Sequence, residues 1–343
     1  YLTAVLLTGF YVCLYWYADY LRGLIQLFDP LSRLVRHRPA DQWFVYGSLY
    51  TLGVLLLGVK FMYKYRHNRY QLVRTASVMF FQFIFAWLLP AWMQMMNQPD
   101  FYFTYFWPLK YDYLFPSTTA WLTNSPHLGI FLVFWATAMS FVATPLLTWF
   151  FGKRWYCSWV CGCGALAETT GDSFGCLSDK SLRAWKTERI LIHSVLVFIV
   201  VVTLLLWVNS YTKGGVFGDA SERLAKIYSF VIGSLFSGVL GTGFYPLFGN
   251  RFWCRFGCPQ AAILGFFLIY FSRFRITTNG GQCISCGNCS TYCEMGIDVK
   301  AYAQKGQDII RASCVGCGIC SAVCPRGVLR LENSRHQTPA SKD

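Results

Sequence analysis

The amino-acid sequence predicts an all-α polytopic membrane protein of about six transmembrane helices, followed by a small C-terminal α+β domain. Three observations support this prediction. Only 13% of the 343 residues are charged, while 55% are apolar and 19% aromatic. The apolar residues gather in runs of about 20, which is the length that crosses the hydrocarbon core of a bilayer. Eight of the 15 cysteines lie in a polar segment between Cys283 and Cys324. We place the membrane domain at 1–272, the C-terminal domain at 273–335 and a disordered tail at 336–343.

The candidate spans follow from the apolar runs, taken in order along the chain. They cover approximately residues 1–18, 42–62, 75–98, 127–150, 190–210 and 227–249. The apolar segment 261–271 is too short to cross a bilayer, so we expect an interfacial or re-entrant helix there. The segment 101–122 is rich in Tyr, Phe and Trp, which is typical of a loop lying at the membrane interface.

The distribution of Lys and Arg orients these spans. With the C-terminus inside, 15 basic residues lie in the inner loops and 8 in the outer loops. The inner loops are 60–74, 151–189 and 251–282, and the outer loops are 22–41, 99–126 and 211–226. An excess of positive charge on the inner side is usual in multi-pass proteins, and it explains the net charge of +14 without a nucleic-acid partner. The first outer loop holds four arginines against this rule. It is either an amphipathic helix on the outer surface or a sign that the first span is misplaced.

Two four-cysteine runs dominate the C-terminal domain. The first has the spacing C-x2-C-x2-C-x3-C from Cys283, and the second repeats it from Cys314 and ends in Cys324-Pro325. In this pattern three thiolates of one run bind three corners of a [4Fe–4S] cube, and the fourth binds the cube of the other run. The sequence therefore predicts a bacterial-type 2[4Fe–4S] ferredoxin domain. The expected ligands are Cys283, Cys286, Cys289 and Cys324 for the first cluster, and Cys314, Cys317, Cys320 and Cys293 for the second.

Zinc is the alternative for such thiols, but zinc patterns use two pairs of ligands rather than two runs of four. A disulfide framework fits the spacing less well than metal ligation. The domain therefore belongs at a reducing face, and we expect a bacterial inner membrane protein with this domain in the cytoplasm. Gly287, Gly316 and Gly318 are expected to let the backbone pass close to the sulfurs. Glu294 stands where Pro usually follows the first run, and its charge is expected to lower the potential of the first cluster.

An internal repeat places further cysteines at the ends of two spans. Residues Phe151–Cys161 read F-G-K-R-W-Y-C-x3-C, and residues Phe248–Cys258 read F-G-N-R-F-W-C-x3-C. Each copy follows a span that runs inward, so the copies end at the same face and form a pseudo-twofold pair. Residues four apart share one face of a helix, so each copy is expected to present two thiolates together. These thiolates, from Cys157, Cys161, Cys254 and Cys258, predict one redox metal or cluster site.

Two other interpretations of the membrane cysteines stay open. They are redox-active dithiols without metal, or thiols buried as small apolar side chains. Cys163 and Cys176 are candidate additional ligands, and Cys13 is expected to serve packing. The residues expected to shield the site from water are Trp155, Trp159 and Trp253, and those expected to offset thiolate charge are Arg154 and Arg251.

Other cofactor signals are weak. Gly162-x-Gly164-x-x-Ala167 imitates a dinucleotide fingerprint, but it follows a span and overlaps the cysteine motif, so we reject it. Only His127 and His193 touch predicted spans, and they fall at opposite faces, so no haem is expected. A hydrogen-bonded interfacial histidine is favoured for His193 over a proton carrier at a quinone site. No catalytic residue is expected.

The paired C-x3-C motifs, followed by a two-cluster ferredoxin domain, resemble the membrane-bound polyferredoxins of the NapH, NosR and CcoG type over about residues 127–332. Those families carry C-x3-C-Pro at both positions. Here Cys258-Pro259 fits, whereas Gly162-Cys163 follows Cys161, so the first half-site departs from the pattern. The resemblance implies a quinol dehydrogenase of nitrate reduction, an electron donor to nitrous-oxide reductase or a copper reductase for oxidase assembly. The nitrous-oxide type adds a flavin domain before the first span, and no flavinylation motif is visible in this sequence.

We therefore expect an iron–sulfur electron-transfer subunit of a larger respiratory-type complex. It would relay electrons between the tail clusters, the membrane cysteines and either a membrane quinone or a membrane or periplasmic redox partner. No substrate pocket or acid–base pair is legible in the sequence. The alternative is an assembly factor of the CcoG type that binds and reduces copper at the membrane cysteines, and the third interpretation is a scaffold whose clusters are structural.

Overall fold

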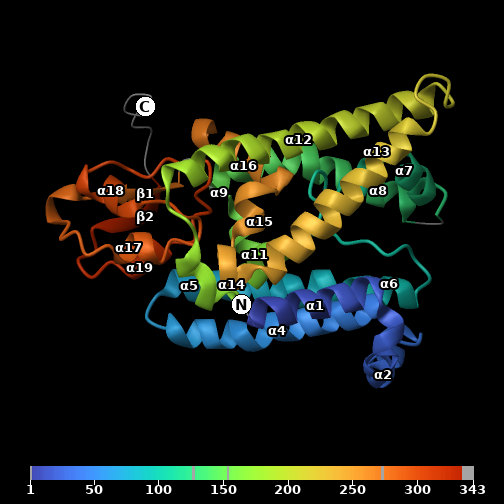
Figure 1. Ribbon diagram of the computed structural model, residues 1–343, viewed down its shortest axis with the longest axis horizontal. Coiled ribbons are helices and arrows are strands. Elements are labelled where there is room, and N and C mark those ends of the chain that lie inside the picture. The colour runs from blue at the N-terminus through green and yellow to red at the C-terminus, as the bar shows by residue number, and fades with distance from the viewer. Residues whose placement is uncertain (1, 126–127, 153, 272–273, 334–343) are drawn as a thin grey trace.

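The computed structural model describes residues 2–125, 128–152, 154–271 and 274–333. His127 and the predicted tail 336–343 lie outside these ranges. Long helices form a bundle, and the small C-terminal domain lies at one end of it (Figure 1).

Five helical segments of the described chain are long and apolar enough to cross a membrane. They are α4 (Gln42–Lys64), α5–η2–α6 (Arg69–Met95), α8–η4–α9 (Gly129–Phe151), α12 (Leu182–Tyr211) and α13–η6 (Ala220–Gly243). The sixth candidate is broken, because α1 (Leu2–Trp16) is followed at 105° by η1–α2 (Ala18–Leu27). Each predicted span falls on one of these six segments. The largest difference between a predicted and an observed boundary is at the start of α12. This helix begins at Leu182, before the predicted span 190–210, because its first turns are polar and an apolar run does not detect them.

Three of the spans contain a π-helical stretch. In the first, η2 (Phe81–Leu88) joins α5 (Arg69–Phe80) to α6 (Leu89–Met95). In the second, η4 (Met139–Ala143) joins α8 (Gly129–Ala138) to α9 (Thr144–Phe151). In the third, η6 (Ser229–Gly243) follows α13 (Ala220–Tyr228) and leads to α14 (Tyr245–Phe248). The outward faces of the spans are apolar, as lipid requires: Leu56, Phe134 and Leu204 are each at least 60% exposed. Side chains cap the helix starts, and Asp41 accepts a 2.7 Å bond from the Phe44 amide at the start of α4.

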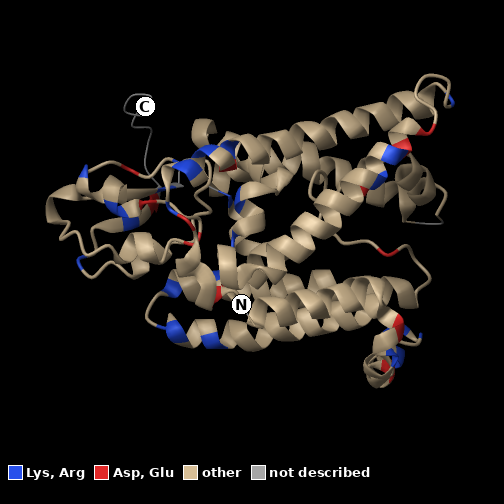
Figure 2. Ribbon diagram, in the orientation of Figure 1, with Lys and Arg blue, Asp and Glu red and all other residues tan. Residues whose placement is uncertain are grey.

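The loops between the spans lie at two opposite ends of the bundle (Figure 1). The α4–α5 turn and the start of α12 lie beside the C-terminal domain, whereas α2 (Arg22–Leu27), α7 (Pro116–Thr123) and the α12–α13 turn lie at the far end (Figure 1). Lys and Arg gather at the end that carries the C-terminal domain, and a smaller group lies on the outer segments (Figure 2). The loops predicted to be inner therefore share one end of the molecule.

The arginine-rich first loop is helical. After α2 (Arg22–Leu27) comes α3 (Asp29–Arg36), which buries Ser32 and Arg36 against the protein and leaves Leu34 exposed. The Arg36 guanidinium donates to Ser32 Oγ at 2.9 Å and to the Pro39 carbonyl at 3.0 Å. This arrangement agrees with a surface helix outside the span, the first of the two explanations.

One segment differs from its prediction, and another is the short apolar helix that was expected. The aromatic loop 101–122 contributes to the protein core, since Phe101, Phe106 and Tyr113 are buried between η3 (Tyr111–Leu114), α7 (Pro116–Thr123) and the spans. Its aromatic side chains therefore pack inward rather than only at a lipid interface. The short apolar helix α16 (Pro259–Phe271) packs against α12 and α9 and leads to the C-terminal domain.

The C-terminal domain has the expected α+β composition. Strands β1 (Phe274–Thr278) and β2 (Leu329–Asn333) pair antiparallel, with Ile276 opposite Leu331. Between them lie the short helices η7 (Gly280–Gln282), α17 (Asn288–Thr291), α18 (Val299–Gln304) and α19 (Ile319–Ala322). The strands close the domain and bring its two cysteine runs side by side.

Candidate functional site: three sets of cysteines and a membrane cavity

The first cysteine set surrounds a small cavity in the C-terminal domain. This cavity has an empty volume of about 360 Å³ and is lined by Cys283, Cys286, Cys289 and Cys324. The fourth of these residues comes from the second run, as the crossed ligation pattern predicts. Gly287, with φ at +82°, allows the sharp turn that starts α17.

The second set surrounds a matching cavity of about 390 Å³. Its lining includes Cys314, Cys317, Cys320 and Cys293, so the crossing is reciprocal. Gly318, with φ at +72°, starts α19 as Gly287 starts α17. Each cavity is thus lined by the four cysteines that the sequence assigns to one cluster.

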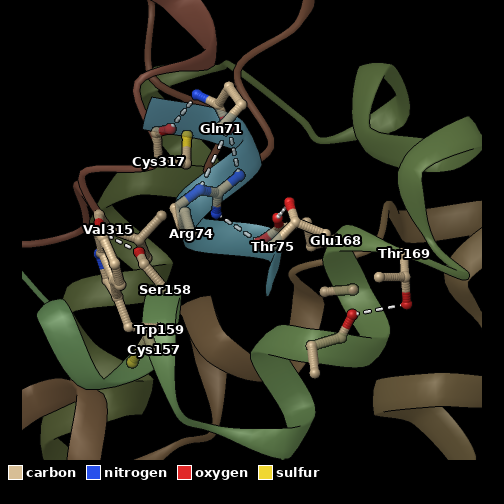
Figure 3. Close-up of polar contacts among 12 residues, drawn as sticks. Gln71, Arg74, Thr75, Cys157, Ser158, Trp159, Glu168, Thr169, Val315 and Cys317 are labelled. Carbon is tan, nitrogen blue, oxygen red and sulfur yellow. Dashed lines mark hydrogen bonds and ion pairs between the residues drawn. The ribbon is translucent and has the colours of Figure 1, made fainter. Parts of the chain in front are cut away.

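The second set lies against the membrane domain. Gln71 Nε2 donates to the Cys317 carbonyl at 2.6 Å, Tyr70 Oη donates to the Gly316 carbonyl at 2.9 Å, and Ser158 Oγ donates to the Val315 carbonyl. Figure 3 shows the Gln71–Cys317 and Ser158–Val315 contacts near the start of α5. The loop that holds the second set is therefore anchored by the membrane domain at three successive carbonyls.

A buried ion pair lies next to this contact, on the membrane-domain side. Arg74 of α5 pairs with Glu168 of α11 (Gly162–Glu168), and both side chains are fully buried (Figure 3). Thr75 Oγ1 donates to the same carboxylate at 2.9 Å. Burial raises the pKa of Glu168, and the Arg74 guanidinium opposes that shift.

Glu294 takes a different position from the one expected. It follows Cys293, which belongs to the second set, so its charge lies beside the second cluster rather than the first. It is buried and pairs with Arg251, whose Nε lies 2.8 Å from Glu294 Oε2. Its backbone carbonyl accepts a 2.6 Å bond from Ser178 Oγ. The residue therefore fastens the domain to the membrane cysteines, and its charge is neutralised.

The two copies of the membrane motif share one backbone path. Gly152 and Gly249, both with positive φ, end the helices α9 and α14. A single short helix follows in each copy, α10 (Trp155–Trp159) or α15 (Phe252–Phe256), and it contains the first cysteine. The repeat therefore extends from sequence to structure.

The pair of cysteines does not lie on one continuous helix, which corrects the prediction. The chain leaves the helix after Trp159 or Phe256, and the second cysteine directly precedes the next helix, α11 or α16. Pro259 fixes this break in the second copy. The consequence is chemical: Cys161 and Cys258 receive the free N–H groups of a helix start, which stabilise a thiolate.

The arginines of the two copies are exchanged. Arg154 Nη1 of the first copy donates to the Cys254 carbonyl at 3.1 Å, and Arg251 Nη1 of the second donates to the Cys157 carbonyl at 3.3 Å. Both guanidinium groups are buried, and Arg154 Nε and Arg251 Nη2 lack a hydrogen-bond partner. Reciprocal contacts of this kind are what a pseudo-twofold axis produces, and the unpartnered donors favour an anionic group between the copies.

The four membrane thiols lie close enough to affect one another's ionisation. Burial raises the pKa of Cys157, Cys254 and Cys258, and neighbouring thiolates raise it further. Cys161 is the exception: a hydrogen bond from the Cys163 thiol, with the amides of helix α11, lowers its pKa to about 7. A buried thiolate is costly unless positive charge lies beside it, and here the buried Arg154 and Arg251 supply that charge, so the site can hold an anionic metal–thiolate group.

The remaining predicted residues divide into two groups. Cys163 lies beside Cys161, as expected for an additional ligand, and Trp253 is buried against Cys254. Cys176 is exposed in η5 (Asp172–Leu177), and His193 is exposed on α12. Among the residues that the structure describes, no three Cys, His, Asp or Glu side chains converge on a point that would hold a single metal ion. A four-iron cube instead binds its thiolates through separate irons.

A large cavity opens beside the membrane cysteines, and no sequence pattern predicted it. It has an empty volume of about 2060 Å³ and lies between α1, α4, α6, η6 and the loop before η3. Its inner wall includes Gly162, Cys163 and Pro259, which adjoin Cys161 and Cys258. Its lining comes from six separate stretches of sequence, so no local pattern reveals it.

Polar side chains gather at the inner wall, where Tyr50 and Tyr105 line the cavity and the buried Gln82 lies behind them. Tyr50 Oη is 2.8 Å from the Gly162 carbonyl and 3.0 Å from Gln82 Oε1, and Gln82 Nε2 donates to the Val160 carbonyl at 2.6 Å. A Cβ at Gly162 would overlap the Tyr105 hydroxyl. These residues give an apolar membrane cavity a few hydrogen-bonding groups next to the cysteines, as in many sites for flat organic cofactors.

Comparison with known families agrees with this geometry. A 4Fe–4S dicluster domain matches residues 275–325, and a 4Fe–4S binding domain matches twice, at 133–183 and 230–276. The first match covers the tail cavities, and the other two each contain one copy of the membrane motif. The class of protein is thus defined by iron–sulfur domains joined to apolar helices.

Individual relatives are distant. The chain is 24% identical over 173 residues to "Putative electron transport protein YccM" of Escherichia coli strain K12, covering 48% of this chain and 47% of that protein. It is 26% identical over 156 residues to an uncharacterized protein of Methanocaldococcus jannaschii, covering 44% and 55%. The chain spans about half the length of these curated relatives, and no solved structure matches it. The domains and the first relative support iron–sulfur electron transfer by a membrane protein.

Proposed function

We propose that this protein is a membrane-anchored iron–sulfur relay between its ferredoxin domain and a membrane quinone, working within a larger respiratory-type complex. One observation carries the proposal: the tail cysteines and the membrane cysteines share a continuous packed core. Cys157 and Cys161 belong to the same buried cluster of side chains as Cys289, Cys314 and Cys320. A shared core holds redox centres at fixed separations, which a relay requires.

The contacts also order the relay. The first tail cluster is the outer one, and the second contacts the membrane domain through the carbonyls of Val315, Gly316 and Cys317. Ser158, which makes one of these contacts, directly follows Cys157. Electrons thus pass from the first cluster to the second and then to the membrane cysteines, or in reverse.

At the membrane cysteines we favour a third [4Fe–4S] cluster over copper. A cube with four thiolates carries a net negative charge, which the exchanged Arg154 and Arg251 are placed to balance. The duplicated 4Fe–4S binding match covers all four ligands.

The cavity supplies the place for a quinone. It lies among the apolar spans, reaches the backbone next to Cys161 and Cys258, and offers the Tyr105 hydroxyl to a carbonyl oxygen. In this scheme the protein is of the NapH, NosR and CcoG type, resides in a bacterial inner membrane and has its ferredoxin domain in the cytoplasm. The excess of basic residues at the ferredoxin end supports this orientation (Figure 2).

Metal content tests the relay directly. Iron, sulfide and copper are measured in the purified full chain, and electron paramagnetic resonance spectra are recorded after reduction. Three cubes correspond to about twelve irons, and we expect Cys258→Ser to lose about four of them and one of three signals. Cys176→Ser is the matched control, because that thiol is exposed and away from the three sets. About eight irons in the wild-type protein contradict the third cluster, and stoichiometric copper supports the assembly-factor alternative.

A further inference from the structure

The end of the large cavity farthest from the cysteines is polar. Its lining there includes Arg36, Asp41, Gln94, Asp100 and Lys110. The helix α6, which ends next to this region, lies at the end of the molecule opposite the ferredoxin domain, whereas α11 lies near the middle (Figure 1). One cavity therefore connects the membrane cysteines with the far face of the protein.

The two acids at this end have different surroundings. Asp41 is committed to structure, since its carboxylate caps α4 through the Phe44 amide and pairs with Arg36 at 3.4 Å. Asp100 lies on the loop after α6, and its side chain is accessible. Asp100 is thus the carboxyl group available to exchange protons with water.

The neighbours of Asp100 tune it without holding it in one charge state. Burial raises the pKa of its carboxyl, whereas a hydrogen bond from Gln94 and the charges of Lys110 and Arg36 lower it and Asp41 raises it. The Tyr102 and Tyr113 hydroxyls are the other titratable groups that sense its charge. A carboxyl with a raised pKa, lying between a cavity and solvent, is suited to take up and release protons.

Reduction of a quinone needs electrons and protons, because two of each convert its two carbonyl groups to hydroxyls. Under the proposed function, electrons reach the cavity from the cysteine wall. We propose that the protons enter from the opposite face of the membrane, through Asp100, and that this residue is the proton-exchange group of the cavity. In the reverse reaction the same carboxyl releases the protons of the quinol to that face. The inference rests on the proposed quinone relay and adds the side of proton exchange.

The test uses the full chain in liposomes that contain decylubiquinone. A reduced soluble ferredoxin, too large to cross the bilayer, is added outside and serves as the electron donor. Only molecules with the ferredoxin domain outside can react, so their far face is in the lumen, where a trapped pH dye reports proton uptake. We expect the lumen to become alkaline as the quinone is reduced.

Variants at the polar end make the test specific. Asp100→Asn is expected to slow quinone reduction by at least about tenfold, while the clusters are reduced as fast as before. Asp100→Glu should restore the rate. Asp112→Asn is the matched control, because Asp112 lies in η3 shortly after this loop and pairs with Lys110 at 3.0 Å but does not line the cavity.

The outcomes separate the two proposals. Proton uptake from the outer medium, or a wild-type rate for Asp100→Asn, overturns the proton route and leaves the relay standing. Reduced clusters that never pass electrons to the quinone in the wild-type protein overturn the relay, and the proton route with it. The cluster signals also report folding. A variant that loses both its activity and its cluster signals therefore does not count as support for the proton route.

Discussion

At the scale of single residues, Arg251 connects three parts of the protein. It bonds the Cys157 carbonyl of the other motif copy, pairs with Glu294 of the ferredoxin domain and retains an unpartnered donor among the membrane cysteines. The sequence suggested the charge-balancing role, because Arg251 and Arg154 stand at the same position of the repeat. The pairing with Glu294 was not predictable, since it joins residues 43 positions apart in two different domains.

Gly162 provides the sharpest test at this scale. A methyl group there would overlap the Tyr105 hydroxyl and lie 2.9 Å from both Tyr50 Oη and Gln82 Oε1. Gly162→Ala should therefore push these polar groups into the cavity, at a cost of about 1–3 kcal/mol for overpacking. We expect the KM for decylubiquinone to rise several-fold while the iron content is unchanged.

Gly53→Ala is the control for this prediction. Gly53 lies on α4, and an added Cβ would meet only Thr170 Oγ1, at 3.8 Å. An unchanged KM in Gly162→Ala would show that the inner wall does not contact the quinone.

At the scale of elements, helix periodicity and apolar length predicted the spans, because lipid demands both along the whole segment. The crossed cysteine sets were predictable for a different reason: the spacing of a run is dictated by the cube it surrounds. The break between Cys157 and Cys161 was not predicted. A spacing of four is compatible with one helix or with a helix end followed by a new helix start, and tertiary packing decides between them.

Helix α5 contacts the second cysteine set, and this contact leads to a prediction about the potential of the second cluster. Its Gln71 side chain is buried and donates to the Cys317 carbonyl at 2.6 Å, so its amide places a positive dipole beside the second cluster. Gln71→Met keeps the size and removes that donor. The reduced cluster is the more negative one, so we expect the potential of the second cluster to fall while that of the first stays unchanged.

Redox titration followed by electron paramagnetic resonance measures both potentials. Gln304→Met is the control, because Gln304 bonds Ser285 at 2.7 Å on the exposed side of the ferredoxin domain. Equal shifts of both clusters would contradict a contact specific to the second.

At the scale of the whole molecule, the sequence predicted the two-part architecture but not the cavity that joins its two faces. Local patterns reveal spans and ligand runs, because each depends on neighbours along the chain. The cavity depends on how separate spans leave a space between them. The contact of Cys163 with that space and the position of Asp100 at its other end follow from packing alone.

The connection between the faces has an electrical consequence. If electrons enter the cavity from the ferredoxin end and protons from the Asp100 end, then each quinone reduced moves positive charge toward the ferredoxin side. A membrane potential that is negative on that side should therefore accelerate quinone reduction, and the opposite potential should slow it. Potassium gradients with valinomycin set the potential in the liposomes, and the rate of quinone reduction is followed. In wild-type protein the rate should change with the sign of the potential. A rate that ignores the potential would mean that electrons and protons reach the cavity from the same side.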